Sequence, residues 1–308
     1  MFLKHTTNKE NCQKQRLDKF LAEKFFLPRA FIQELIKSNG VLVNDKKIKA
    51  HYLLKENEEI KIDEKKIEEM KKAKEIDLSP SKKKLEIIFE DKNFLIINKP
   101  AGLIVHPSAA HRKETLVNIL LNYFPEIKNV GEDEFRPGIV HRLDKEASGL
   151  LAIAKTQKAF EYLKKQFQDR QIEKEYLVLV HGRIKEKKGK IELPIGRLPK
   201  KGFKMSTGYF SKAKPALTEY ELIKYINDYS FLKVKTKTGR THQIRVHLKA
   251  LGYPVVGDKI YKPKKSKKVK LDRIFLHCHK LGFHDLENKK QNFEIGLPDE
   301  LNDFFKSD

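Results

Sequence analysis

Cysteines and long apolar runs are scarce in this sequence. Only Cys12 and Cys278 occur among 308 residues, and no pair of cysteines has the spacing of metal ligands, which fits a reducing cytoplasm without structural disulfides. No apolar run approaches the roughly 18 residues of a transmembrane helix, and the N-terminal residues lack the apolar core of a signal peptide. We therefore expect a cytoplasmic protein that does not insert into a membrane.

Lysine and arginine, by contrast, are abundant. They total 65 against 42 acidic residues, which gives a formal net charge of +23. A surface with such a positive field favours a polyanion as the partner. A lysine-rich composition can also reflect the base bias of a genome, so the charge favours nucleic acid without establishing it. The length suits one large domain and one small domain.

An N-terminal domain of residues 1–63 is predicted from two helical segments and a few short strands. Apolar residues recur with helical spacing in residues 16–26 and 29–38. Pro28 stops the first helix, and Gly40 suits a left-handed cap at the end of the second. Alternating apolar residues around an Asn-Asp turn predict short strands after these helices. A domain of this size has a thin hydrophobic core.

The remainder of the chain contains two strongly charged segments, one before the larger domain and one within it. Residues 64–82 mix lysine and glutamate with almost no apolar side chains and end in Ser-Pro-Ser, which predicts a charged linker whose first half can form a frayed helix. The larger domain then covers residues 83–308. Within it, residues 262–270 are a basic stretch that either contacts RNA or is simply solvated.

The stretch from His141 to Lys155 joins a polar cluster to an apolar run. Gly149 marks the break, and residues 150–154 read as a short buried strand. Asp144 would then lie in an irregular loop fixed to a rigid strand. Catalytic groups concentrate in such loops, because the scaffold sets their geometry. Taken alone, a loop aspartate is more often a turn residue or one half of a surface ion pair.

Two later segments carry candidates for the same site. Tyr176 lies in an apolar run that predicts a central strand, where a core tyrosine with a satisfied hydroxyl is the simpler interpretation. Residues 239–252 predict a helix with one apolar face and a second, basic face that includes His242 and Arg245. The N-terminus of this helix, near Arg240, is a candidate site for binding a phosphate of a nucleic-acid backbone.

Metal binding is not expected at any of the histidines that the sequence brings to notice. His106 has no second His, Asp or Glu at convincing ligand spacing near it. His277, Cys278 and His279 alternate as the residues of a strand would, so they cannot all face one metal ion. The Pro and Gly residues before His106 indicate a fixed backbone path and hence a structural role.

These segments together resemble the motifs of the RluA-type pseudouridine synthases. The central motif of that family reads HRLD, then a small residue, Ser, Gly and an apolar strand, and this chain has HRLDKEASG. The segments NKPAGLIVHP, KEYLVLVHG and KTGRTHQIRVHL match further family segments in the same order. The chain departs from the usual pattern at Ala147, where Thr is usual, at Ala213, where Gly is usual, and at Cys278, where a small residue is common.

The resemblance implies a fold class and a reaction. The fold would be α+β, with a catalytic domain built on a mixed, largely antiparallel sheet with flanking helices. Uridine in RNA would be isomerised to pseudouridine, which breaks the bond from N1 to C1′ and joins the ribose to C5 of the same uracil. Because no atom is gained and no electron is transferred, no redox cofactor, ATP or metal is expected.

The resemblance also assigns roles to single residues. Asp144 would be the catalytic residue and Arg245 its ion-pair partner; the arginine would favour the ionised carboxylate, whereas burial would oppose it. Tyr176 would lie against the target base and act as a candidate general base. Enzymes that act on a base flip it out of its stack, and Arg142 would fill the vacated position. Further candidates for contacts with the RNA are His141, Arg240 and His242.

The N-terminal domain resembles the S4 RNA-binding domain, because RLDKFLAEKF, a basic second helix and VLVNDKKIK occur in the usual order. By this resemblance, phosphate contacts, which give affinity without reading sequence, are expected from Arg29, Gln33, Lys37 and Lys46. A solvated helix face is the alternative. An S4 domain before this catalytic domain favours large-subunit (23S-type) ribosomal RNA as the partner, although tRNA-directed relatives share the motifs. We expect a monomer.

Three other classes of protein compete with this interpretation. A non-catalytic RNA-binding ribosome-assembly factor would suit the charge, but it would not need Asp144, Tyr176 and Arg245 together. A glycosidase would require a second catalytic carboxylate, for which the sequence has no clear candidate. A kinase interpretation of HRLD fails because the loop Asn and the Gly-rich phosphate loop are missing.

Overall fold

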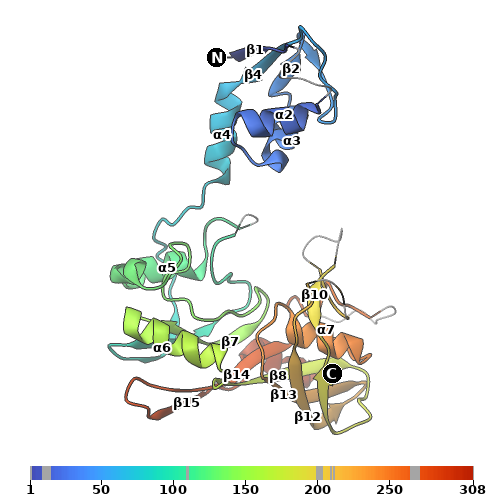
Figure 1. Ribbon diagram of the computed structural model, residues 1–308. Coiled ribbons are helices and arrows are strands. Elements are labelled where there is room, and N and C mark those ends of the chain that lie inside the picture. The colour runs from blue at the N-terminus through green and yellow to red at the C-terminus, as the bar shows by residue number, and fades with distance from the viewer. Residues whose placement is uncertain are drawn as a thin grey trace. The chain divides into compact units, whose positions relative to one another are not determined.

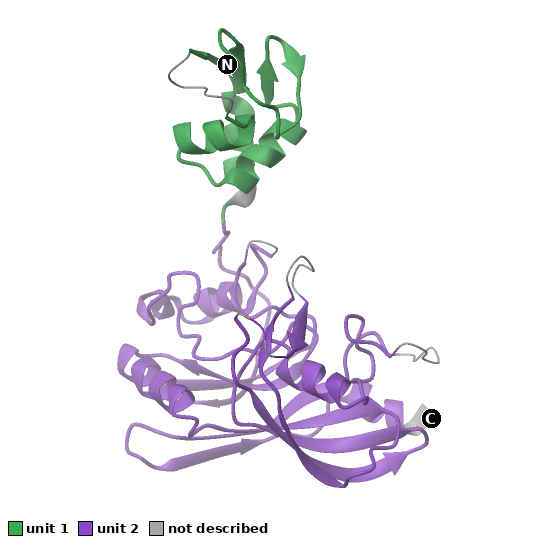
Figure 2. Ribbon diagram, turned by 45° about the vertical axis from the view of Figure 1, so that its right-hand side comes forward, with its two compact units in different colours: residues 1–75 green, residues 76–308 purple. Residues whose placement is uncertain are grey.

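The chain divides into two compact units, residues 1–75 (unit 1) and residues 76–308 (unit 2), in the computed structural model (Figure 2). The structure describes residues 2–8, 15–108, 111–198, 204–208, 210, 212–263 and 271–307. Cys12 and most of the basic stretch at 262–270 lie outside these ranges. Each unit has a hydrophobic core of its own.

Unit 1 packs helices against a four-stranded antiparallel sheet. The two predicted helices are present as α2 (Leu17–Lys24) and α3 (Arg29–Lys37). The strands lie in the order β1 (Phe2–Thr6), β4 (Glu59–Asp63), β2 (Val41–Val43) and β3 (Lys46–Lys47). The core is formed by apolar side chains from both layers, including Leu17, Leu21, Ile32, Leu35, Ile60 and Ile62.

The end of α3 differs from the prediction. Asn39, with a φ of 58°, is the left-handed residue, and Gly40 does not have a positive φ. A Cβ at Gly40 would lie 2.4 Å from Cδ1 of Leu35, far inside van der Waals contact. Gly40 is therefore needed for the close approach of the chain to the core, and asparagine, which tolerates the left-handed region, supplies the cap.

Residues 64–74, the first part of the predicted linker, form helix α4 (Glu64–Lys74) and belong to unit 1. Oδ1 of Asp63 accepts a hydrogen bond from the backbone N–H of Lys66 at 3.2 Å, which caps the start of α4. Ile67 is buried in the core of unit 1. Met70, one turn further along α4, also packs against this core, so two apolar side chains hold a strongly charged segment as a helix.

The segment that follows α4 is tied to unit 2. The backbone N–H of Asp77 donates to the carbonyl of Arg112, and the side-chain amide of Asn118 donates to the carbonyls of Asp77 and Ser79. Helix α4 is held in unit 1 and residues 77–79 are held in unit 2, so only a short connection around Glu75 remains between the two compact units.

Unit 2 is built on a nine-stranded mixed sheet, which confirms the predicted fold class (Figure 1). The pairing of β7 with β14 is parallel, and every other pairing among its described strands is antiparallel. The strands follow the order β5 (Glu86–Glu90), β6 (Phe94–Lys99), β7 (Ser148–Ala154), β14 (Leu276–His284), β8 (Glu173–His181), β13 (Tyr229–Thr236), β12 (Leu217–Ile226) and β9 (Lys188–Glu192), and β15 (Lys290–Glu294) also pairs with β14.

Three main helices lie above this sheet in Figure 1: α5 (Leu116–Tyr123), α6 (Gln157–Gln168) and α7 (Gln243–Ala250). The smaller elements are η1 (Pro125–Asn129), the two-stranded sheet of β10 (Ile195–Arg197) and β11 (Met205–Thr207), and the short helices α8 (Asp299–Asn302) and α9 (Phe304–Ser307). Among the described residues, no helix is both long enough and apolar enough to cross a lipid bilayer.

The centre of the sheet fixes the loop that carries Asp144. All seven residues of β7 are buried, as the apolar run predicts. Gly149 has a φ of 115°, and a Cβ there would lie 2.2 Å from the carbonyl oxygen of Cys278 on β14. Only glycine allows this close contact between β7 and β14. The loop immediately before β7 is therefore attached to the buried centre of the sheet.

Candidate active site

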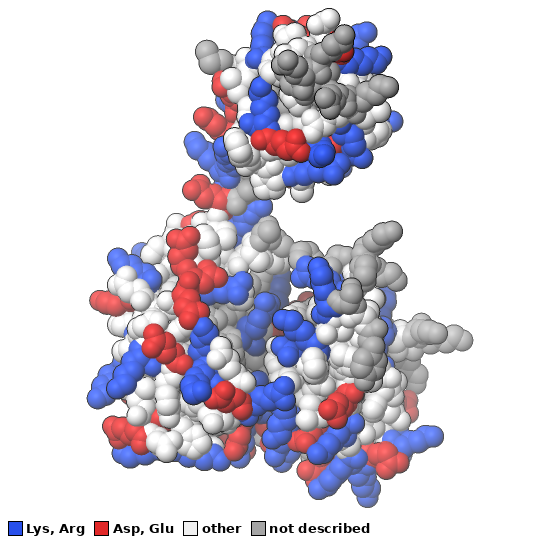
Figure 3. Space-filling view, in the orientation of Figure 1, with Lys and Arg blue, Asp and Glu red and all other residues white. Residues whose placement is uncertain are grey.

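A pocket of about 460 Å³ lies in unit 2 between the loop before β7, strand β8 and the start of α7. Its lining includes one carboxylate, Asp144, and seven cationic side chains: Arg142, Lys164, Arg170, Lys174, Lys237, Arg240 and Arg245. Figure 3 shows Lys and Arg side chains gathered around a hollow on this face of unit 2. The excess of positive charge suits an anionic ligand.

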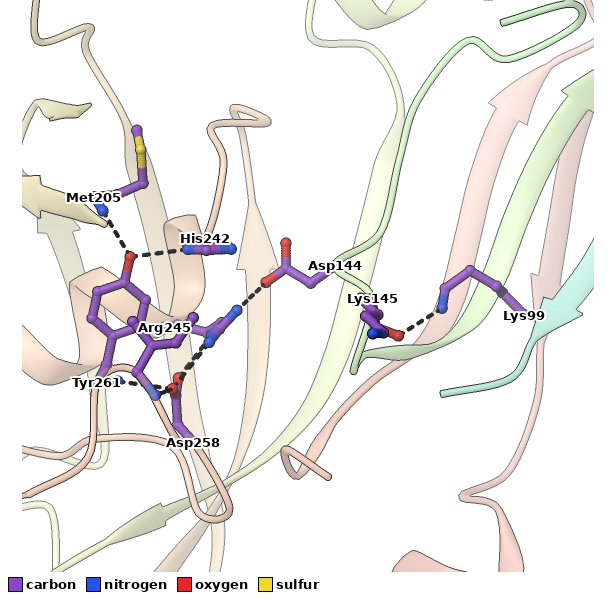
Figure 4. Close-up of polar contacts among 9 residues, drawn as sticks. Lys99, Asp144, Lys145, Met205, His242, Arg245, Asp258 and Tyr261 are labelled. Carbon is purple, nitrogen blue, oxygen red and sulfur yellow. Dashed lines mark hydrogen bonds and ion pairs between the residues drawn. The ribbon is translucent and has the colours of Figure 1, made fainter. Parts of the chain in front are cut away.

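Arg245 connects Asp144 to a second carboxylate (Figure 4). Its Nη1 donates to Oδ2 of Asp144 at 3.0 Å. Its Nε and Nη2 donate to the two oxygens of Asp258 at 2.7 and 3.0 Å, which is the bidentate geometry that arginine prefers. The contact between Arg245 and Asp144 that the resemblance implies is therefore present, and Asp258 holds the guanidinium from the other side.

Arg245 is deeply buried, with 4% of its side chain exposed, although helical periodicity assigned it to a basic face. Burial disfavours its charge, but the hydrogen bonds and negative charges of Asp258 and Asp144 outweigh burial and raise the pKa of Arg245 above its ordinary value. The same contacts lower the pKa of Asp258 against the effect of its burial. Both partners therefore stay ionised at neutral pH.

Asp258 was not among the residues singled out from the sequence. It follows α7 and is the first acidic residue after Arg245 in the chain. Its Oδ1 also accepts the backbone N–H groups of Ile260 and Tyr261, each at 2.8 Å, so the carboxylate is fixed by the turn that it caps. A buried arginine requires a counter-charge, and the nearest following acid was the available signal.

Lys99 holds the backbone of the Asp144 loop through the carbonyl of Lys145 (Figure 4). Nζ of Lys99, which is fully buried, donates to the carbonyl oxygens of Pro100, Leu103 and Lys145 at 2.7, 2.9 and 3.3 Å. The N–H of Gly102 donates to the same carbonyl of Lys145 at 2.8 Å. Two donors from the Lys-Pro-Ala-Gly segment thus fix the residue next to Asp144.

Burial and the charge of Arg273 lower the pKa of Lys99 to about 7, and the charge of Asp144 partly opposes this decrease. Asp144 itself is half-enclosed, with 16% of its side chain exposed. One oxygen faces Arg245, and Figure 4 shows the other oxygen pointing away from it. An anionic oxygen on a fixed backbone, inside a basic pocket, is suited to nucleophilic or general-base chemistry.

Tyr176 lies on β8, opposite Cys278 on β14, and lines the same pocket. Burial, the neighbouring thiol of Cys278 and the charge of Asp144 raise the pKa of Tyr176 well above its ordinary value. The ring is therefore a neutral phenol at neutral pH. Burial disfavours the phenolate that a general base would provide.

The other residues predicted at the site occupy different parts of the pocket. Arg142 is exposed at its edge. His242 has a left-handed φ of 56° before α7, and its Nδ1 lies 2.9 Å from the hydroxyl of Tyr261. Nε of Arg240 donates to the carbonyl of Pro215 at 3.1 Å. All three belong to the rim that surrounds Asp144.

His141 lines the pocket but is also fastened to the scaffold. Its Nε2 accepts the backbone N–H of Ala152 at 2.9 Å, and its ring stacks on Phe167 with the centroids 4.7 Å apart. Burial, together with the charge of Lys174, lowers the pKa of His141 to about 3, so the ring is neutral. These contacts anchor the loop to β7 and α6.

Of the remaining histidines, His277 and His279 have polar contacts, whereas Nδ1 of His106 is buried without a hydrogen-bond partner among the described residues. Oγ of Ser148 lies 2.8 Å from Nδ1 of His277, and Nε2 of His279 lies 2.8 Å from Glu175. His106 is buried, and burial lowers its pKa to about 4, with the charges of Arg136 and Arg142 contributing. Among the residues that the structure describes, no group of three or more His, Cys, Asp or Glu residues is placed to hold a metal ion.

In unit 1, a buried carboxylate organises the basic face of α3. Asp18 has no exposed side-chain surface and accepts a pair of hydrogen bonds from Arg16, a second pair from Arg29 and one from Gln33. Burial opposes its ionisation, but these donors lower the pKa of Asp18 to about 2. Two of the four predicted phosphate contacts are thus held in place by Asp18, and the other two, Lys37 and Lys46, are exposed on α3 and β3.

Comparison with known proteins agrees with these features. Residues 93–250 match the family described as RNA pseudouridylate synthase, and residues 15–60 match the S4 domain. An uncharacterized RNA pseudouridine synthase of Aquifex aeolicus is 38% identical over 299 residues, which cover 93% of this chain and 92% of the relative. The ribosomal large subunit pseudouridine synthase D of Borreliella burgdorferi is 37% identical over 314 residues, covering 98% and 93%. The solved structure of human RNA pseudouridylate synthase domain containing 1 has a TM-score of 0.57 at 30% identity, covering 71% of this chain and 85% of that one.

Proposed function

Since this chain belongs to the family of RNA pseudouridylate synthases and is therefore an RNA-modifying isomerase, we propose that it converts specific uridines of large-subunit ribosomal RNA to pseudouridine. The relative from Borreliella burgdorferi is named for the large ribosomal subunit, and the aligned region covers nearly the full length of both chains. The S4 domain supports a structured RNA as the substrate. The enzyme would act in the cytoplasm as a monomer.

The observation that carries the proposal is the Asp144–Arg245 ion pair inside a pocket whose described lining has six further cations and no second carboxylate. Arg245, fixed by Asp258, keeps a positive charge against one oxygen of Asp144. Asp144 is then the catalytic group that acts on the ribose or the uracil of the target nucleotide. The bond from N1 to C1′ breaks, a bond from C5 to C1′ forms, and the hydrogen of C5 is released as a proton while N1 gains one.

Base flipping is the second element of the proposal. A uridine within a helix does not present its glycosidic bond to a side chain, so the nucleotide must leave the stack. The pocket of about 460 Å³ gives room for a flipped base together with part of its backbone. Tyr176, a buried neutral phenol, packs against the base, and the exposed Arg142 fills the gap that the nucleotide leaves.

The basic rim and unit 1 supply affinity. Arg170, Lys237 and Arg240 lie around the pocket where phosphates next to the flipped nucleotide would pass. Arg29 and Gln33, aligned by Asp18, contact further phosphates together with Lys37 and Lys46. Such contacts release counterions and bind RNA without reading its sequence, so the identity of the target uridine depends on the shape of the RNA.

The proposed substrate is tested by mapping pseudouridines in total RNA from cells with and without this gene. We expect one or a few large-subunit ribosomal positions to revert to uridine in the deletion strain and to be restored by the wild-type gene, but not by the Asp144→Asn gene. Loss of tRNA pseudouridines with an unchanged ribosomal pattern would contradict the proposed substrate. An unchanged pattern in all RNA would contradict the proposed activity in the cell.

A further inference from the structure

Lys174 places a partly buried ammonium group inside the pocket without an acidic partner. Its Nζ lies 5.3 Å from the ring centroid of Phe167, and a Cβ at Gly239 would lie 3.9 Å from the same Nζ. Both neighbours line the pocket, so the ammonium group lies between two of its walls. Within the described part of the chain, Nζ of Lys174 has neither a hydrogen-bond acceptor nor an ion-pair partner.

Two other cations of the pocket differ in this respect, the buried Arg245 and the partly exposed Lys164. Arg245 is held by two carboxylates, and Lys164 pairs with Glu132. Burial lowers the pKa of Lys174, and the neighbouring Cys278 partly opposes this decrease. The Phe167 ring offers a weak cation–π contact, which compensates for part of the lost hydration but supplies no hydrogen-bond acceptor. An electron-rich group from the substrate would complete the site.

Strand geometry relates Lys174 to the position of the base. Lys174 and Tyr176 are two residues apart on β8, so their side chains leave the same face of the strand roughly 7 Å apart. A uracil packed against the ring of Tyr176 would turn one of its edges toward Lys174. An ammonium group has three donors and no acceptor, so it pairs with a carbonyl oxygen and not with the N3–H of uracil.

We infer that Lys174 is a substrate-recognition residue whose ammonium group donates a hydrogen bond to a carbonyl oxygen of the flipped uracil. This inference rests on the proposed function. The contact would strengthen during the reaction, because breaking the bond from N1 to C1′ leaves negative charge on the uracil and on its carbonyl oxygens. If the acceptor is the C4 oxygen, the contact would also disfavour cytosine, which presents an amino group at that position.

A phosphate contact is the competing role for Lys174. The exposed cations Arg142, Arg170 and Lys237 occupy the edge of the pocket, where the RNA backbone would pass. Lys174 lies further in, against Phe167 and beside Tyr176, where the flipped base is expected. The two roles differ in a measurable way, because a phosphate contact contributes to affinity and its salt dependence, whereas a contact with the reacting base contributes mainly to the rate.

The test compares Lys174→Met with Lys92→Met, which removes one exposed lysine from the β5–β6 turn, outside the pocket. Single-turnover rates of tritium release from C5-labelled uridine and RNA affinities at several salt concentrations are measured. For Lys174→Met we expect a rate about 100-fold lower, as for the loss of one preorganised donor, with Kd within about twofold and an unchanged salt slope. Lys92→Met should match the wild type in rate.

Substrate analogues identify the atom. RNA with 2-thiouridine or 4-thiouridine at the target position replaces one carbonyl oxygen by a weaker acceptor. With one of the two analogues we expect the wild type to react much more slowly than with natural RNA. Lys174→Met should react with that analogue at nearly the same rate as with natural RNA. Equal sensitivity of the two proteins to both analogues would contradict the contact. Lys174→Gln, which retains a neutral donor, should have an intermediate rate and replaces the Met variant if that protein does not fold.

The outcomes separate this inference from the proposed function. If wild-type protein releases no tritium, the proposed function fails. If the wild type is active and Lys174→Met reacts at the wild-type rate, only the inference about Lys174 is overturned. A Lys174→Met variant with normal single-turnover rate, weaker binding and a smaller salt slope would assign Lys174 to a phosphate and would equally overturn it.

Discussion

At the scale of single residues, the guanidinium of Arg245 is shared between Asp144 and Asp258, and this sharing determines what a substitution will do. Removal of the charge takes away the partner of Asp144 and also leaves Asp258 as a buried carboxylate with only backbone donors. Activity and stability are therefore expected to decrease together.

We predict that Arg245→Met lowers the single-turnover rate at least about 100-fold, a magnitude typical of one lost electrostatic group at a reacting centre. The free energy of unfolding should decrease by about 3 kcal/mol, because a buried charge loses its partner. Arg245→Lys retains the charge but not the bidentate geometry, so its rate and its free energy of unfolding should lie between those of the wild type and Arg245→Met. Rates are measured with saturating protein, and stability by urea unfolding. A Met variant with wild-type turnover would show that the ion pair has no part in catalysis.

The same residues show which contacts of the site could be predicted from the sequence. The motif resemblance was sufficient to pair Arg245 with Asp144, 101 positions apart in the chain. Helical periodicity, however, placed Arg245 on a basic face away from the apolar one, because periodicity registers apolar residues and cannot detect a charge that is buried with its partners. Asp258 was missed for the same reason, since its role depends on the path of the chain after α7. The segment NKPAGLIVHP was predicted to have a structural role from its Pro and Gly residues, and the contact of Lys99 with the Asp144 loop is visible only in the structure.

At the scale of elements, strands and helices with strong apolar patterns were predicted well, and their ends less well. The buried strand β7 follows from its uninterrupted apolar run. Helix α7 is shorter than residues 239–252, because His242 takes a left-handed conformation and the side chain of Gln243 accepts hydrogen bonds from Thr238 and the backbone of Arg240. Side-chain contacts of this kind decide where a helix begins, and composition does not reveal them.

Asp18 accepts hydrogen bonds from Arg29 and Gln33, the two phosphate-binding candidates in the first half of α3. We predict that Asp18→Asn weakens RNA binding several-fold and increases hydrogen exchange in α2 and α3, because the amide can no longer accept all the donors of Arg16, Arg29 and Gln33. Hydrogen exchange followed by mass spectrometry on the full chain measures the second effect. Lys92→Met again serves as the control. Unchanged exchange and affinity would show that the Asp18 cluster organises neither the fold nor the RNA contacts.

At the scale of the whole molecule, unit 2 should lose stability in mild acid. Burial is the main reason that the pKa of His106 is lowered to about 4, that of His141 to about 3 and that of His277 to about 4. Below pH 6.5 the unfolded chain binds protons at these positions and the folded chain does not. The free energy of unfolding should therefore fall between about pH 6.5 and pH 4, by up to about 1.4 kcal/mol per pH unit for each histidine.

Urea unfolding of the full chain at pH 7.5 and pH 5 measures this effect. We expect the midpoint assigned to unit 2 to be lower at pH 5, with a difference that is reduced in His277→Asn. Equal midpoints at the two pH values would mean that the three rings take up protons without unfolding, and hence that they are more accessible than the structure indicates.

The connection between the units gives a second prediction at this scale. Helix α4 packs on the core of unit 1, and residues 77–81 hydrogen-bond to other parts of unit 2. Limited trypsin treatment should therefore cut first near the end of α4, at Lys71, Lys72 or Lys74, rather than evenly across residues 64–82. The domain boundaries predicted from composition placed the whole charged segment outside both domains. Mass spectrometry of the first fragments decides between these positions. Early cuts within residues 85–155 would contradict a separately folded unit 2.

The most direct test of the central claim is tritium release from C5-labelled uridine in RNA by the wild type and by Asp144→Asn. Formation of the bond from C5 to C1′ must expel that hydrogen, so release reports the isomerisation itself. The variant keeps the shape of Asp144 and most of its hydrogen bonding but loses the charge. We predict release by the wild type, background release by the variant, RNA affinity within about tenfold, or about 1.4 kcal/mol, and an unchanged melting curve. Release by Asp144→Asn at the wild-type rate would contradict the assignment of Asp144 as the catalytic residue.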